Sequence, residues 1–213
     1  NCYDFKNYKI IKKILLEEKK IIYFFTSSII TYLNFEKIRN EKHFLKTQKL
    51  KINKYIPKNL AIAKRKIEID LLRGRGIKFC ILRMHNIIGA NDHSEKTSFV
   101  KYVNQAYLDK KNISPKSLIQ FAYVKDVAKI VKKLIMNIKS GKKIHSVYNV
   151  ANEPLSFDEL ISIKKKINKK NNKKFDREIV ENLIVDNKKI KANLNYTFSS
   201  SRNTVKELFK DIW

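Results

Sequence analysis

Apolar residues in the first part of the chain alternate between helical spacing and short continuous runs. Within residues 3–18 they recur at intervals of three and four, which predicts a helix. The next run, IIYFFTSS at 21–28, is apolar on both faces and ends in hydroxyl residues, a pattern typical of a buried strand. Helical spacing returns over 59–72 and stops at the glycines of 74–76, and IKFCILR at 77–83 predicts a second buried strand.

The rest of the chain continues this alternation. Further elements are predicted as a helix at 96–110, an extended piece at 118–124, a helix at 124–138, a strand at 146–151 and a terminal helix at 201–213. Ser156 and Glu159 form a capping-box pattern that starts one more helix. The polar segment 33–58, which carries Pro57, is predicted to be a surface loop. Strands that are apolar on both faces and alternate with helices indicate a parallel sheet covered by helices, so the predicted fold class is α/β.

The composition allows one sizeable folded domain. With 213 residues and 43% hydrophobic content the chain can bury a core, and its apolar runs fall well short of the about 20 residues that a membrane helix needs. The formal charge of +27 suggests nucleic-acid binding, but 40 of the 47 basic residues are lysines spread over nearly every segment, so that function stays a remote alternative. Two cysteines, Cys2 and Cys80, make no disulfide framework, so a buried thiol at Cys80 and a reducing, cytoplasmic compartment are expected.

The helix predicted at 59–72 carries the first candidate chemistry. Its stretch LAIAKRKIE places Lys64 four residues before Glu68 and four residues after Leu60. Side chains four apart lie on one helix face, so these three side chains point the same way. The spacing suits a lysine that acts together with the residue one turn before it.

Other stretches complete a pattern in chain order. They are NCYDFKNYKIIKKIL at 1–15, YFFTSSIITY at 23–32, LRMHNIIGA at 82–90, FAYVKDVAKIV at 121–131 and YNVANEPLSFDELI at 148–161. Together with LAIAKRKIE, this series resembles the extended short-chain dehydrogenase/reductases, in particular the NAD-dependent epimerase/dehydratase family that acts on nucleotide sugars. The resemblance implies a Rossmann-like parallel sheet flanked by helices, present in part, with a small C-terminal substrate lobe. It also implies that residues 1–213 are the latter part of an NAD(P)-binding epimerase/dehydratase domain, with lobe elements within about 84–213.

The resemblance assigns roles to five residues. Ser28 falls at the catalytic hydroxyl position, where it positions the substrate oxygen, and Lys64 falls where the family's lysine holds the nicotinamide ribose. In the family, the charge of that lysine also lowers the pKa of a tyrosine from about 10 toward working pH, and the tyrosine exchanges a proton with the substrate. Ser27 and Met84 lie at strand ends that meet the nicotinamide end of the cofactor. Asn86 is expected to contact the substrate.

Two positions depart from the family pattern. Leu60 stands where the tyrosine belongs, and Tyr55, which could replace it, lies before Pro57 and outside the predicted helix. Ile119 stands where an arginine commonly grips the diphosphate. Asp126 matches the family, but a carboxylate also suits the start of any helix, so a structural role is favoured there. The departures support an alternative in which the chain is a catalytically impaired relative that binds a cofactor or a partner protein.

The expected cofactor is NAD or NADP. None of the four glycines forms the G-x-G-x-x-G turn that brings backbone amides against the pyrophosphate, so the resemblance begins partway through the family fold. We predict that the 213-residue chain alone binds NAD(H) or NADP(H) poorly, and calorimetry that finds micromolar binding would contradict this. The expected partners are a nucleotide sugar and, as in many relatives, a second copy in a homodimer.

Some polar residues also have a simpler interpretation. Arg83 and Asn86 can be read as ordinary hydrogen-bonding residues of a loop. The histidines show no ligand spacing with one another or with the cysteines, so no zinc site is expected and they are predicted to occupy surface or loop positions. They are His43, His85, His93 and His145.

Overall fold

The computed structural model describes residues 4–18, 20–33, 39–42, 57–89, 118–167 and 184–212. The helices are α1 (Phe5–Glu17), α3 (Lys58–Arg73), α5 (Val124–Lys139), α6 (Phe157–Ile167), α7 (Lys188–Leu194) and α8 (Ser201–Ile212), with a 3-10 turn η1 (Ile29–Tyr32). The strands are β1 (Ile22–Ser28), β2 (Lys78–Met84), β3 (Ile87–Ile88), β4 (Leu118–Ile119), β5 (Ala122–Tyr123), β6 (Val147–Val150) and β7 (Leu155–Ser156). Of these described helices, none is both long enough and apolar enough to span a bilayer.

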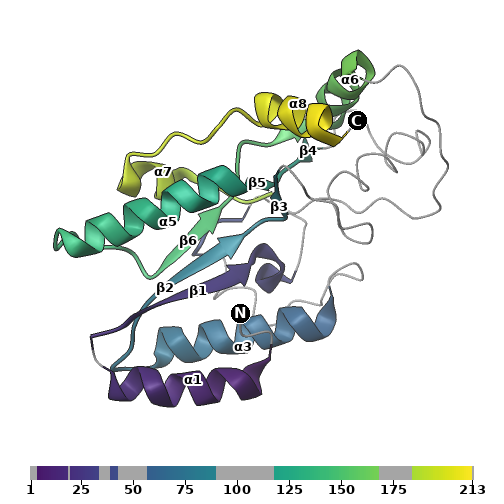
Figure 1. Ribbon diagram of the computed structural model, residues 1–213. Helices are drawn as coiled ribbons and strands as arrows, with labels where there is room; N and C mark the ends of the chain where they lie inside the picture. The colour runs from purple at the N-terminus through teal and green to yellow at the C-terminus, as the bar shows by residue number, and fades with distance from the viewer. Residues whose placement is uncertain are drawn as a thin grey trace.

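The main sheet is parallel and has the strand order β1-β2-β6. Its register pairs Ser28 with Met84 and Arg83 with Asn149, so the carboxyl ends of the strands lie along one edge. Figure 1 shows α1 and α3 on one face of this sheet and α5 and α7 on the other. The predicted α/β fold with a helix-covered parallel sheet is therefore confirmed.

The main strands carry continuous apolar runs, residues 22–25 in β1 and 79–82 in β2, because both faces of the sheet are covered. One set of strand side chains packs against α1 and α3, in a cluster that includes Phe25, Ile81 and Ile67. The alternate set packs against α5 and α7, in a cluster that includes Cys80 and Leu134. Burying one such aliphatic or aromatic side chain stabilises the fold by about 1.5–3 kcal/mol. Cys80 is buried as expected, and this burial raises the pKa of its thiol to about 12.

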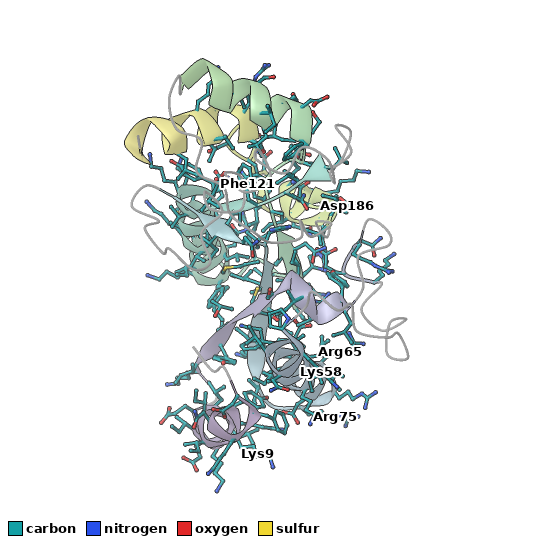
Figure 2. All side chains as sticks on the ribbon, turned by 90° about the vertical axis from the view of Figure 1, so that its right-hand side faces the viewer. Lys9, Lys58, Arg65, Arg75, Phe121 and Asp186 are labelled. Carbon is teal, nitrogen blue, oxygen red and sulfur yellow. The ribbon has the colours of Figure 1, made fainter. Side chains whose placement is uncertain are left out.

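A second, smaller core forms beyond the carboxyl ends of the main strands (Figure 1). Here β3 pairs with β5, β4 pairs with β7, and α6 packs against α8. Phe121 is fully buried in this core and lies beneath the two helices in Figure 2. The capping box is confirmed, because the Ser156 amide donates to Glu159 at 3.0 Å and the Glu159 amide donates to the Ser156 hydroxyl at 3.2 Å.

Two predictions need correction or lie outside the described residues. The segment 33–58 is not wholly a surface loop, because Arg39 is 8% exposed and exchanges backbone hydrogen bonds with Ile184 and Asp186. Arg39 also lies beside β6, because the Asn149 side chain donates to the Arg39 carbonyl at 3.3 Å. The helix predicted at 96–110 falls on residues outside the described ranges.

Candidate functional site

The serine turn is the segment from Ser27 to Leu33, where β1 ends and η1 begins. The Ser28 Oγ accepts a hydrogen bond from the Ile30 amide at 3.4 Å, and the Ser28 carbonyl accepts one from the Thr31 hydroxyl at 2.8 Å. Leu33 closes the turn with a φ of 66°, in the left-handed region that leucine rarely adopts. The turn leaves Ser28 half-buried at the carboxyl edge of the main sheet.

Lys64 reaches the same end of β1 from α3. Its ammonium donates to the Thr26 carbonyl at 2.8 Å and lies 5.5 Å from the centre of the Phe25 ring. Thr26 precedes Ser28 by two residues, so Lys64 is bonded to the same strand that ends at the predicted serine. Lys64 is only 7% exposed, and burial lowers the pKa of its ammonium below the ordinary value, although the charge of Glu68 acts to raise it.

Beside the serine turn lies a buried polar group that we call the Glu68 cluster: Glu68, Arg83, Tyr32 and Asn149. Arg83 donates to Glu68 Oε2 through Nε at 2.9 Å and Nη2 at 2.7 Å. Its Nη1 donates to the Tyr32 hydroxyl at 3.0 Å, which in turn donates to Asn149 Oδ1 at 2.8 Å. Burial acts to lower the pKa of Arg83, but the charges and hydrogen bonds of Glu68 and Tyr32 together outweigh it and raise this pKa. The interpretation of Arg83 as a loop residue is wrong, because Arg83 lies within β2 and neutralises a buried carboxylate.

Ser27 and Met84 use their side chains inside the fold. The Ser27 hydroxyl, 5% exposed, donates a short hydrogen bond to Glu68. Met84 is 8% exposed and packs in the cluster against α5 and α7. Any contact that these two residues make with a cofactor would therefore come mainly from their backbone, and their predicted role stays a prediction.

Asn86 lies two residues beyond the end of β2 and is exposed. Its amide donates to His85 Nδ1 at 2.7 Å, and its carbonyl accepts from the Ala122 amide at 2.9 Å. The backbone of Asn86 is thus fixed at the carboxyl edge while its side chain faces outward. His85 lies in the loop between β2 and β3, one of the two predicted settings, but it is only 5% exposed, and its amide donates to the Val150 carbonyl at 3.1 Å.

Asp126 lies in the first turn of α5 and is 1% exposed. It accepts hydrogen bonds from Asn152 Nδ2 at 2.7 Å, from the Tyr196 hydroxyl at 2.6 Å and from the Ser199 hydroxyl at 2.9 Å. Burial and the carboxylate both raise the pKa of Tyr196. The favoured structural role of Asp126 agrees with these contacts, which tie three segments together. Ile119, at the position of the family's arginine, is 3% exposed in the smaller core.

The arrangement of these motifs can be compared with known proteins. A sequence model described as the NAD dependent epimerase/dehydratase family matches residues 25–151, a range that includes the serine turn, α3 and Asn86. The chain belongs to this family. A comparison with curated protein sequences finds no match.

Solved structures of nucleotide-sugar epimerases share the fold of this family member. A UDP-N-acetylglucosamine 4-epimerase from Methanobrevibacter ruminantium M1, in complex with UDP-N-acetylmuramic acid, superposes with a TM-score of 0.67 at 16% identity, over 95% of this chain and 66% of that one. A UDP-glucuronic acid 4-epimerase from Bacillus cereus, in complex with UDP-glucuronic acid and NAD, gives 0.65 at 18%, over 95% and 66%. A UDP-glucose 4-epimerase with UDP-glucose from Thermotoga maritima gives 0.65 at 20%, over 93% and 67%. The chain spans about two thirds of the length of these proteins, and at such identities the likeness concerns the fold alone.

Leu60 stands at the position where the sequence resemblance predicts the family's tyrosine. This half-buried leucine lies one helical turn before Lys64 and carries no proton to exchange. Tyr32 is no substitute, because it is fully buried between Arg83 and Asn149, and burial raises the pKa of its hydroxyl to about 12. Tyr55 lies outside the described residues.

Sequence reasoning missed the partnership of Glu68 with Arg83 and the part played by Asn149. A signal for it was present, because Arg83 interrupts an otherwise apolar strand run and Asn149 does the same in β6. Buried polar groups need hydrogen-bond partners, so two such interruptions on neighbouring strands indicate a shared network. The identity of the third partner, a carboxylate on α3, could not be read from that signal.

Proposed function

We propose that this chain carries the serine and lysine part of an NAD(P)-dependent sugar-nucleotide epimerase, dehydratase or reductase. The observation that carries the proposal is the contact between the Lys64 ammonium and the Thr26 carbonyl, two residues before Ser28, within the range that matches the family. The solved structures named above, which bear UDP-sugars and in one case NAD, support the same class of substrate and cofactor.

In this proposal Ser28 positions the substrate oxygen and Asn86 holds the substrate from the exposed end of β2. Lys64 holds the nicotinamide ribose, and the backbones of Ser27 and Met84 line the nicotinamide end. The donors suit such a group, because a buried ammonium is bonded to β1 and a half-buried hydroxyl lies at the end of that strand. NAD(P), when bound, supplies the acceptor and donor of hydride. The 213 residues contain no G-x-G-x-x-G turn for the pyrophosphate, so the ribose end is the part that this chain addresses.

Ligand binding tests the proposal without requiring turnover. Saturation-transfer NMR with UDP-glucose, UDP-N-acetylglucosamine and UDP-glucuronic acid should detect binding of at least one of them, and Asn86→Ala should weaken it. Lys64→Met should further weaken NAD binding, which we predict to be poor, and leave the UDP-sugar signal in place. The exposed Lys66→Met on the same helix is the matched control. Absence of binding by every UDP-sugar and by NAD would refute the proposal.

The second candidate is a catalytically impaired family member that binds a cofactor or partner, and Leu60 favours it. Leu60→Tyr restores the family's pairing with Lys64, and Leu60→Phe adds a ring without the hydroxyl. If the chain is impaired, Leu60→Tyr should raise epimerase turnover by about a hundredfold or more, the scale of general acid–base catalysis, while Leu60→Phe should not. Turnover by the unaltered chain would reject the impaired alternative.

A further inference from the structure

The Glu68 cluster connects elements that are far apart in sequence. Glu68 comes from α3, Arg83 from β2, Tyr32 from η1 and Asn149 from β6. All four are fully buried. Hydrogen bonds of 2.7–3.0 Å run from the carboxylate through the guanidinium and the phenol to the amide. The cluster therefore fixes the relative positions of one helix, two strands and the serine turn.

The cluster holds the serine turn on both sides of Ser28. The Ser27 hydroxyl donates to Glu68 Oε1, and the Thr31 hydroxyl lies 3.4 Å from the same oxygen. From three residues earlier on α3, Arg65 donates to the Thr31 carbonyl at 2.6 Å. Ser28 itself does not reach the carboxylate, and its Oγ accepts only the long bond from Ile30 among the described contacts. The orientation of the Ser28 hydroxyl is thus set by its anchored neighbours.

Asn149 connects the cluster to the segments beside β6, the last strand in the order of the main sheet. Asn149 Nδ2 donates to the Arg39 carbonyl at 3.3 Å and to the Asp186 carbonyl at 3.2 Å, and the Asn149 amide donates to Glu41 Oε1 at 2.9 Å. Those backbone segments, 39–42 and 184–187, are held to each other by a bridge between Arg39 and Val185. The far end of the cluster is thus anchored to these two segments, apart from the serine turn.

Stability alone gives little reason for such a cluster. A buried ion pair is costly to desolvate, and apolar side chains of similar volume are often as stabilising or more so. What a fully bonded polar cluster adds is a single arrangement with directional contacts. We propose that Glu68 is a positioning residue, which fixes the Ser28 hydroxyl through Ser27 and Thr31 without contacting substrate. The inference rests on the proposed function for the role of Ser28, while its structural part stands by itself.

Hydrogen exchange tests the structural part. Glu68→Gln should make the amides of Ile30 and Leu33 exchange about tenfold faster while the amides of β6 keep their rates, because the turn opens locally. Ser27→Ala, which leaves the ion pair intact, should do the same and keeps the test valid if Glu68→Gln does not fold. The matched control is Asp70→Asn on the same helix, which removes a carboxylate bonded to Lys12 and Tyr8 and should leave the turn unchanged. Unaltered turn exchange in Ser27→Ala would overturn the proposal.

A double-mutant cycle on UDP-sugar affinity tests whether Glu68 acts through Ser28. Glu68→Gln and Ser28→Ala should each weaken binding by about tenfold, and the double variant should be no weaker than Ser28→Ala alone. A merely structural effect of Glu68 would add to that of Ser28, and additivity would therefore contradict the proposal. If the unaltered chain binds no UDP-sugar, the proposed function fails, and the exchange rates alone then decide whether Glu68 holds the turn.

Discussion

Two buried carboxylates, Glu68 and Asp126, are stabilised in the protein interior by different kinds of hydrogen-bond donors. Glu68 lies in the interior of α3, and Arg83 neutralises it with a salt bridge of 2.7 Å. Asp126 lies in the first turn of α5 and accepts from neutral donors: an amide, a phenol and a serine. The start of a helix offers a favourable electrostatic field to an anion, whereas the interior of a helix does not. The position within the helix thus explains why one carboxylate has a cation at contact distance and the other is bonded to neutral groups.

The largest effect should come from removing the cation. Arg83→Met leaves Glu68 buried without the cation that contacts it and should lower the free energy of unfolding by about 3–5 kcal/mol in urea titrations. The double variant Arg83→Met with Glu68→Leu should recover much of this loss, because neither member of the ion pair is then buried without the other. A loss below 1 kcal/mol in the single variant would show that the pair is not what holds the elements together.

A smaller loss is expected at the carboxylate without a cation. Asp126→Asn replaces one of the two acceptor oxygens with an NH2 group, which then faces the hydroxyl and amide donors around it. The free energy of unfolding should therefore fall by about 2–3 kcal/mol. The control is Asp158→Asn, which changes an exposed acid in the first turn of α6. It should lower the free energy of unfolding by only a small fraction of the loss in Asp126→Asn. Equal losses in the two variants would mean that the bonds of Asp126 contribute nothing beyond the helix field.

The capping box gives the exposed version of the same helix-start arrangement. Ser156→Ala removes the hydroxyl that caps α6 and should cost about 1 kcal/mol in thermal or urea unfolding. Ser162→Ala, on the same helix with its hydroxyl bonded back to the Asp158 carbonyl, should be nearly neutral. A larger effect at Ser162 than at Ser156 would reverse the expected order.

A partly exposed ion pair should give the smallest effect and a distinct pH dependence. Burial acts to raise the pKa of Asp70, but hydrogen bonds from Lys12 and Tyr8 outweigh it and hold this pKa below its ordinary value. The stabilisation is therefore present above the unfolded pKa of about 4 and is lost as the pH falls through the lower folded value. Since the pair is 30% exposed, its contribution should stay below about 1 kcal/mol. The stability difference between the unaltered chain and Asp70→Asn, measured from pH 7 to pH 2, should shrink in acid.

The main sheet and most of its helices could be predicted because their periodicity is strong. Runs such as 21–28 and 77–83 are apolar on both faces, and burial between two helix layers is the physical reason. Helix α7 was not predicted, since seven residues give too short a pattern to separate from a loop.

The candidate site was predicted less completely than the fold. Spacing placed Lys64 and Glu68 on one helix face, and the order of motifs placed Ser28 at a strand end. Spacing cannot name the partner across the fold, so the pairing of Glu68 with Arg83 and the burial of His85 were missed. Periodicity describes the faces of an element, while polar contacts depend on the register between elements.

The thiol in the middle strand of the main sheet has a practical consequence. Cys80 is fully shielded and its thiolate is suppressed while the strand is in place, so alkylating reagents meet it only in molecules whose core has opened. In a Cys2→Ser background, the rate at which Cys80 is alkylated would report how often the main sheet opens around β2. Cys80 is thus a built-in probe of local opening in the main sheet, and no added label is needed.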